Sequence, residues 1–269
     1  MQGMQFATLS ITAPGKKPSR RRTDNQDRVL CRTLDVSGSQ GVLLSVADGI
    51  SGCPYGGSVA RWIVEQHLAK DAVAFPDGRD PADALRTYLE QIHTEFYAEA
   101  TTRGIDGFAD SGASLAVGLL HHTAADCFWA GDSPIFISRR TSSGYDTEMI
   151  STPDHSIGGQ LTNCFGGGSP FELRHRRLQL AHGDIITVAS DGVAVDEHTL
   201  SHVYRTKAFT KAALDQMIRL SSRGQFWDDL SIAAGQGHLQ SDACNILSRN
   251  MAKAGEVQGH ARRAVASDQ

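Results

Sequence analysis

Strand-like and helix-like segments occur in separate groups along this chain of 269 residues, and that order most constrains its fold. The hydrophobic pattern predicts three strands, two helices, a run of short strands, two more helices and a final strand. Segregated groups are typical of an α+β domain, because βαβ proteins alternate strands with helices. We therefore predict sheet packed on sheet, with helix pairs outside.

The predicted elements are bounded by turn residues and by helix-start signals such as Pro81 after Asp80. The predicted strands span residues 5–11, 28–35, 41–47, 114–120, 126–130, 135–138, 171–180, 185–189 and 230–234. The predicted helices span residues 56–68, 196–203 and 207–220, with a fourth that starts at Pro81 and includes Ile92.

Composition excludes several classes of protein. A hydrophobic fraction of 40% and a charged fraction of 21% indicate a folded domain rather than a disordered chain. A net charge of −4 argues against a nucleic-acid partner, and no apolar stretch is long enough to predict a membrane partner. Five cysteines without a CxxC pair, and no signal peptide, predict reduced thiols and a cytoplasmic location. We also expect a monomer.

Acidic residues stand where predicted strands begin or end. Asp48 follows the buried run 42–47, Asp132 follows 128–131, Asp191 follows 184–190, and Asp228 precedes the last strand. Asp-Gly pairs are also common in turns, so any one of these residues could simply form a turn.

Four carboxylates at strand ends of one domain would repel one another unless a hard cation neutralised them. Carboxylate oxygens select Mg²⁺, Mn²⁺ or Ca²⁺, and a pair of such ions suits hydrolysis of phosphate esters. The pattern therefore indicates a metal-dependent hydrolase.

Nine short motifs, in order, resemble those of the metal-dependent protein phosphatases, the 2C class of serine/threonine phosphatases. They are R-T-D-N-Q-D (22–27), V-A-D-G-I-S-G (46–52), G-G-S-V-A (56–60), S-G-A-S-L (111–115), G-D-S (131–133), D-H-S (154–156), L-T-N-C-F-G-G (161–167), G-D-I-I-T-V-A-S-D-G-V (183–193) and D-D-L-S (228–231). The resemblance covers nearly the whole chain. It implies a four-layer αββα sandwich of two antiparallel sheets, with a phosphatase domain at 1–240 and a C-terminal helix and tail at 241–269.

The resemblance also implies two Mn²⁺ or Mg²⁺ ions and a third, weaker one. Asp48 would bridge the first two ions, and the carbonyl of Gly49 would ligate one of them. Asp191 and Asp228 would complete the first ion, and Asp132 would hold the third together with Asp191.

Two further roles come from the R-T-D-N-Q-D motif. Asp27 would act mainly through water, and Arg22 would grip the substrate phosphate, for which a guanidinium is well shaped. On base rates Arg22 would be one of a solvated basic cluster, but its spacing to Asn25 and Asp27 favours the phosphate role. Asn25 and Ser114 could support the site or merely cap a turn or fill the core.

The chain departs from the family pattern at several positions. Ile50 stands where some relatives carry a histidine that can donate a proton, and His155 is the nearest replacement by motif, although a structural role is the simpler interpretation. Asp229 replaces a common asparagine, which could tighten cation binding or be solvated. Gln26 replaces a common acid. The segment 154–166 is short, which predicts an open site and a third ion that is weakly held or absent.

Three alternatives compete with an active phosphatase of broad range. A serine hydrolase would need a G-x-S-x-G elbow, and the sequence around Ser114 lacks its final glycine. A catalytically inactive binding module would be expected to have lost at least one of Asp48, Asp191, Asp228 and Arg22. A phosphatase dedicated to one phosphorylated partner, such as a regulatory protein, remains open. The resemblance to compact bacterial members of the family implies phosphorylated protein substrates that are products of a partner Ser/Thr kinase.

Overall fold

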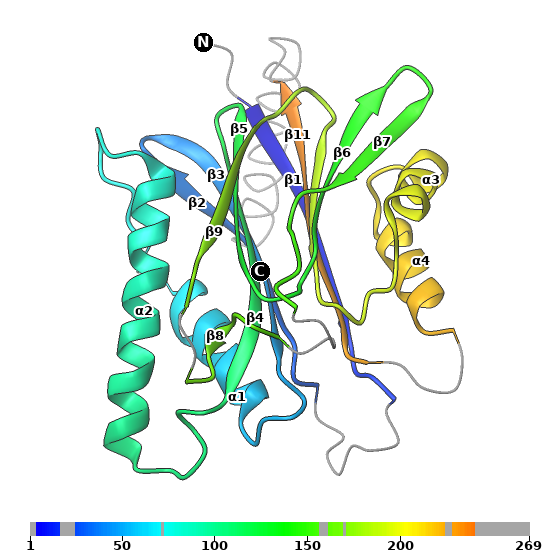
Figure 1. Cartoon of the computed structure of the whole chain (residues 1–269). Helices are drawn as coiled ribbons and strands as arrows, with labels where there is room; N and C mark the ends of the chain where they lie inside the picture. The colour runs from blue at the N-terminus through cyan, green and yellow to red at the C-terminus, as the bar shows by residue number, and fades with distance from the viewer. Residues whose placement is uncertain are drawn as a thin grey trace, which may run out of the picture.

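Two antiparallel β-sheets pack face to face, and helices cover their outer faces (Figure 1). The computed structural model describes residues 4–16, 25–70, 73–155, 161–168, 171–223 and 228–239. Arg22 and the predicted C-terminal segment 241–269 lie outside these residues, so the structure leaves both predictions as they stand.

The strands of the first sheet lie in the order β1-β11-β10-β6-β7, and those of the second in the order β2-β3-β4-β5-β9, with β8 paired to β4. The bounds in the first sheet are β1 Met4–Ala13, β11 Leu230–Leu239, β10 Ile185–Ala189, β6 Ile135–Thr141 and β7 Gly144–Met149. Those in the second sheet are β2 Arg28–Val36, β3 Ser39–Gly49, β4 Gly112–His121, β5 Ala124–Ala130, β9 Arg174–Gln179 and β8 Phe165–Gly166.

The helices form one group on each outer face. The second sheet is covered by α1 Gly56–Arg61, the π-helical turn η1 Trp62–Leu68 and α2 Pro81–Arg103, and the first by α3 Glu197–Lys207 and α4 Lys211–Ser221. Local chemistry fixes their ends: the side chain of Asp80 accepts the N–H of Ala82 at 2.8 Å, and Gly104 ends α2 with a φ of 58°.

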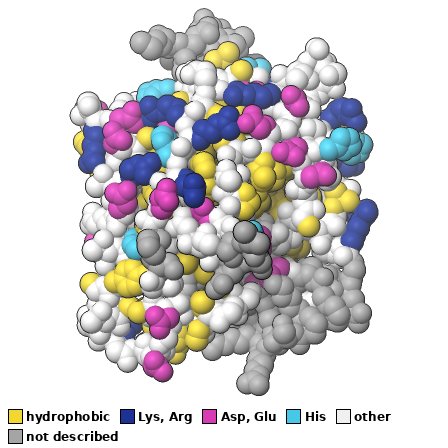
Figure 2. Space-filling model, in the orientation of Figure 1, with side chains coloured by type: hydrophobic (Ala, Val, Ile, Leu, Met, Phe, Trp, Pro, Cys, Tyr) yellow, Lys and Arg dark blue, Asp and Glu magenta, His cyan; other side chains and the backbone are white. Residues whose placement is uncertain are grey.

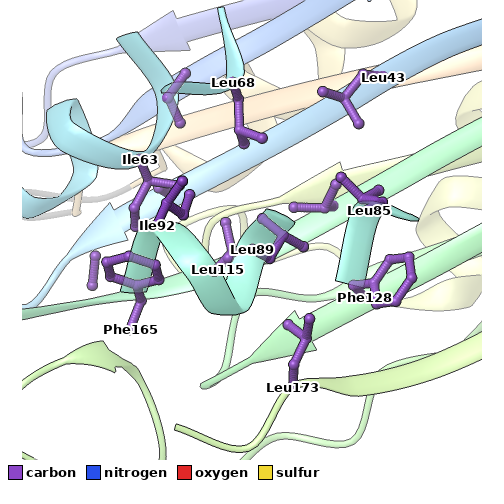
Figure 3. Packing of buried hydrophobic residues seen from close by; sticks show 14 of the residues in the cluster. Leu43, Ile63, Leu68, Leu85, Leu89, Ile92, Leu115, Phe128, Phe165 and Leu173 are labelled. Atoms are coloured by element: carbon purple, nitrogen blue, oxygen red, sulfur yellow. The ribbon is translucent and has the colours of Figure 1, made fainter. Parts of the chain in front are cut away.

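Three hydrophobic cores separate the four layers. β3 serves two of them, because Val42, Leu44 and Val46 face the other sheet while Leu43 faces the helices. Figure 3 shows Leu43 in the outer core together with side chains of α2, η1 and β8. The third core lies between the first sheet and the helix pair α3 and α4. The predicted αββα sandwich is therefore confirmed.

Element boundaries differ from the predictions where local signals are weak. The edge strand β7 and the two-residue β8 were not predicted, since the polar sequence of β7 shows no clear alternation and β8 is too short to show a pattern. The helix predicted at 207–220 begins only at Lys211, because Ala208 has a φ of 52° and breaks the path between α3 and α4.

Strand β9 carries a run of basic residues that are paired within the fold. Arg174 contacts Asp154, Arg176 contacts Glu148, and Arg177 contacts both Asp80 and Asp126. Figure 2 shows basic and acidic side chains interspersed over the upper part of the face drawn there.

The structure can be compared with two predictions from sequence, that the thiols are reduced and that no segment spans a membrane. The four cysteines within the described ranges are free thiols, and Cys244 lies outside them. Within the same ranges, no helix combines the length and the apolar character needed to cross a membrane.

A buried charge network joins β4, β5 and β9. Asp126 is fully buried, and its carboxylate lies 2.8 Å from Nε2 of His121, 2.8 Å from Nε2 of His175 and 2.7 Å from Nε of Arg177. Burial alone would raise the pKa of Asp126, but these hydrogen bonds outweigh it and hold the pKa well below its ordinary value. Its ionised form therefore stabilises the fold.

We expect Asp126→Asn to lower the free energy of unfolding at pH 7 by about 3 kcal/mol, because it leaves its partners without a countercharge. A depressed pKa contributes stability that is present above the ordinary value of 3.8 and is lost as the pH falls toward the folded value. In urea unfolding, the difference in the free energy of unfolding between wild type and variant should therefore become smaller below about pH 3.8. Asp106→Asn, at an exposed position, should change the stability by less than about 0.5 kcal/mol; equal effects of the two variants would contradict this role.

Candidate metal centre

Four carboxylates from both sheets line one cavity of about 480 Å³. Asp48 is the second-last residue of β3, Asp132 follows β5, Asp191 follows β10, and Asp228 precedes β11. The structure thus brings these four predicted carboxylates together with Gly49, although they lie up to 180 residues apart in sequence.

Asp27 lies beside Asp48 because of the register of two strands. Arg28 of β2 is opposite Ala47 of β3, so the next pair along the register places Asp27 opposite Asp48. Asp27 is 2% exposed, and neither of its carboxylate oxygens has a hydrogen-bond partner in the described structure.

Burial raises the pKa of Asp27 to about 6, although the nearby hydroxyls of Ser190 and Ser231 offset part of the rise. Burial, together with the charges of Asp27 and Asp191, raises the pKa of Asp48 well above its ordinary value. Ionised carboxylates in such a place are unfavourable without a positive charge nearby.

Asp132 is positioned by Gly131 and by the loop that follows β7. Gly131 has a φ of 105°, and a Cβ there would lie 2.6 Å from that of Ser114, so only glycine fits. Nε2 of His155 lies 2.9 Å from Oδ2 of Asp132. Burial and the charge of Asp191 raise the pKa of Asp132, while His155 opposes the rise.

In the two Asp-Gly pairs, glycine is needed because another part of the backbone lies very close to it, and not because its φ is positive. Asp191 and Gly192 do form a turn, since the N–H of Val193 donates to the carbonyl of Ser190 at 3.1 Å, but neither Gly192 nor Gly49 has a positive φ. A Cβ on Gly192 would lie 2.1 Å from the carbonyl oxygen of Asp229.

Gly49 also lies very close to another part of the backbone, at Gly56. A Cβ on Gly49 would lie 2.4 Å from the carbonyl carbon of Gly56 at the start of α1. The turn interpretation of these pairs is therefore incomplete, because each glycine lets a second backbone approach the carboxylate beside it.

Asp229 is buried rather than solvated, so one of its two sequence interpretations is wrong, while a role in tightening cation binding stays a prediction. It is 1% exposed, and its carboxylate accepts the N–H of Gly15 at 2.6 Å and the N–H of Gln26 at 2.7 Å. Gly15 and Gln26 lie on either side of the segment that contains Arg22. Asp229 therefore joins the two described stretches of chain that precede and follow residues 17–24.

The two supporting residues have short-range partners. The side-chain oxygen of Asn25 accepts the N–H of Asp27 at 2.8 Å, and its amide donates to Thr12 at 2.7 Å, so it caps the chain just before Asp27. Ser114 lines the cavity, and its hydroxyl lies 2.5 Å from that of Ser133. Ser114 lies within β4 rather than on an elbow, which removes the basis for a serine hydrolase.

Asp154, a residue to which the sequence gave no role, anchors the stem of the short segment near Asp132. It is 4% exposed and accepts hydrogen bonds from the N–H of Gly131, the amide of Asn163 and the guanidinium of Arg174. The D-H-S motif pointed to Asp154, but no local pattern marks Arg174 as its partner. Residues 156–160 lie outside the described chain, so the prediction of an open site stands untested.

Comparison with known proteins gives the family directly. The sequence model of the protein phosphatase 2C family matches residues 14–230. The chain belongs to the protein phosphatase 2C family. Curated protein sequences give no match to it.

Solved bacterial phosphatases share this phosphatase 2C fold. PppA of Pseudomonas aeruginosa, described as a key regulatory component of T6SS, is 24% identical with a TM-score of 0.65, covering 86% of this chain and 97% of its own. Stp1 of Staphylococcus aureus is 15% identical with a TM-score of 0.71, covering 87% and 96%. PstP/Ppp of Mycobacterium tuberculosis is 16% identical with a TM-score of 0.68, covering 86% and 98%.

The metals on which the phosphatase 2C family depends can be tested against the residues present. The side-chain donors are carboxylates, which suit Mg²⁺ and Mn²⁺, and the unpartnered oxygens of Asp27 are the kind of group that an ion or its waters would satisfy. In the described part of the chain, no three acidic, histidine or cysteine side chains meet closely enough to hold an ion as they stand. The residues fit the metals in type and location, and binding would require small movements of the side chains.

Proposed function

We propose that this phosphatase 2C family member is an active, metal-dependent protein serine/threonine phosphatase. The observation that carries the proposal is the convergence of Asp48, Asp132, Asp191 and Asp228 on one cavity, beside the unpartnered carboxylate of Asp27. A cavity of about 480 Å³ is also large enough for a phosphorylated side chain.

Two Mn²⁺ or Mg²⁺ ions would be held by Asp48, the carbonyl of Gly49, Asp191 and Asp228. Asp27 would act on one of these ions through water. When bound, the ions would supply a more acidic water as nucleophile and would neutralise the phosphate oxygens.

The residues of the chain orient these groups. The Gly49–Gly56 approach seats the end of β3 against the start of α1, so that Asp48 is held on rigid elements. The antiparallel pairing of β10 with β11 brings the turn at Asp191 close to Asp228. Arg22 would bind two phosphate oxygens, and Asp229 holds Gly15 and Gln26, which precede and follow Arg22 in the described chain.

The substrates would be phosphorylated proteins, and we expect them to be products of a partner Ser/Thr kinase. PppA is described as a key regulatory component of T6SS, and this similarity is compatible with a single dedicated phosphoprotein partner for the present chain. A cytoplasmic location, a monomeric state and the absence of nucleic-acid or membrane partners stay predictions from sequence.

The test is release of phosphate from a phosphothreonine peptide with Mn²⁺, with Mg²⁺ and with a chelator. We expect activity with metal only, and a loss of at least about 10³-fold in Asp191→Ala, because the ligand is removed from an electrostatic site. Asp106→Ala, at an exposed position, should retain full activity. A folded wild-type protein that releases no phosphate with either metal would instead support the inactive binding module.

A further inference from the structure

His155 contacts Asp132 from a separate segment of the chain. Its Nε2 lies 2.9 Å from Oδ2 of Asp132, and the two side chains are 38% and 12% exposed. Because the histidine is open to solvent, we expect the contact to contribute only about 0–1 kcal/mol to stability, although Asp132 itself is largely buried. The contact is therefore a poor candidate for holding the fold together.

The neighbouring residues nevertheless fix this contact. The N–H of Asp154 donates to the carbonyl of Gly131 at 3.0 Å, and the N–H of Gly131 donates back to Oδ2 of Asp154 at 3.1 Å. Because Gly131 precedes Asp132 and Asp154 precedes His155, this two-way pairing sets the histidine beside the carboxylate.

Arg174 and Asn163 hold Asp154 in turn. Nε of Arg174 lies 2.8 Å from Oδ1 of Asp154, and the amide of Asn163 donates to Oδ2 at 2.8 Å. The carbonyl of Asp154 accepts the N–H of Thr162 at 2.9 Å, which closes the stem. A chain of contacts thus runs from β9 through Asp154 and His155 to Asp132.

With Asp132 ionised, the ring N–H of His155 donates to one carboxylate oxygen. A carboxylate offers about four acceptor positions, so the other oxygen stays able to bind an ion in the cavity. Hydrogen bonds of this kind orient metal ligands, and their loss typically costs about 10–100-fold in metal affinity.

We propose that His155 is a positioning residue for Asp132 and that it sets the affinity of the third, weakest divalent ion of the site. Arg174 supports the same affinity indirectly, because it holds Asp154, which in turn places His155 beside Asp132. The inference rests on the proposed metal-dependent function, and it concerns only the ion that Asp132 would share with Asp191.

Titration of the purified chain with Mn²⁺, followed by the electron paramagnetic resonance signal of free Mn²⁺, tests this directly. We expect two tighter ions and one weaker ion in the wild type. His155→Leu should lower the affinity for the weakest ion by about 10–100-fold and leave the affinities for the two tighter ions unchanged. His155→Gln should stay within about threefold of the wild type, because its amide can donate from nearly the position of Nε2.

Strand β9 offers a matched pair of controls. Arg174→Leu should lower the affinity for the weakest ion several-fold, because Arg174 contacts Asp154. Arg176→Leu should leave all affinities unchanged, since Arg176 contacts Glu148 and not Asp154. Thermal unfolding of every variant in chelator should show that the fold is intact.

Three outcomes would overturn the inference. The first is that His155→Leu binds the weakest ion with the wild-type affinity. The second is that His155→Leu binds all the ions more weakly by the same factor. The third is that the wild type binds only two ions. Each of these leaves the proposed function standing if the wild type still hydrolyses phosphothreonine with Mn²⁺. Absence of both binding and hydrolysis would instead overturn the proposed function.

Discussion

Asp48→Asn is expected to abolish metal-dependent phosphate release and, in chelator at pH 7, to make the protein more stable than the wild type. Activity should fall by at least about 10³-fold, because the proposed bridging carboxylate would supply several kcal/mol to the transition state. The stability should rise because burial, together with the charges of Asp27 and Asp191, raises the pKa of Asp48. A neutral amide of similar size removes that repulsion and the cost of burying the charge, so we expect a gain on the order of 1 kcal/mol.

Saturating Mn²⁺ should reverse the order of stability. An ion that binds only the folded state adds about 2.7 kcal/mol at one hundred times its dissociation constant, and the variant would lose most of this gain. Urea unfolding of both proteins, with chelator and with Mn²⁺, measures the crossover. If Asp48→Asn were less stable than the wild type in chelator, the carboxylate would be satisfied by the protein itself, against the metal assignment.

Gly192→Ala is expected to lower both stability and activity, although it removes no polar group. The new Cβ would overlap the carbonyl oxygen of Asp229 at 2.1 Å, and the atom it meets belongs to the backbone. Relief requires the turn after β10 and the start of β11 to move apart. We expect a loss of at least about 3 kcal/mol in the free energy of unfolding, since backbone cannot yield as a flexible side chain would.

The same movement would displace Asp191 relative to Asp228, so activity should fall by about 100-fold or more. Gly38→Ala is the matched control, because Gly38 has a φ of 77° but nothing within 4 Å of its added Cβ. It should cost only the conformational strain of about 1–2 kcal/mol and leave activity unchanged. Similar losses in the two variants would show that glycine flexibility, rather than close approach, explains Gly192.

Much of the fold follows from patterns that are local in sequence. The apolar run of β3 predicts a strand buried on both faces, and the structure places Leu43 and Leu44 in two different cores. The cap at Asp80 and Pro81 starts α2 as predicted. Strand β7 escaped prediction because it is an exposed edge strand, where burial imposes no alternating pattern.

The candidate site follows from sequence only in part. The positions of Asp48, Asp191 and Asp228 at strand ends predict that they could converge, and the structure places them around one cavity. Their roles toward metals are still proposals. The burial of Asp229 could not be predicted, because its partners, Gly15 and Gln26, lie more than 200 residues earlier and donate backbone N–H groups, which residue identity does not reveal.

The sequence by itself determined the grouping of strands and helices, the carboxylates at the strand ends and the family motifs in their order, because periodicity and residue type are local properties. Only the tertiary structure decided which backbones touch. The approach of Gly192 to Asp229 and the contact of Arg174 with Asp154 depend on how distant strands pair and pack. Such contacts are set by the free energy of the whole sandwich, so no segment read alone contains them.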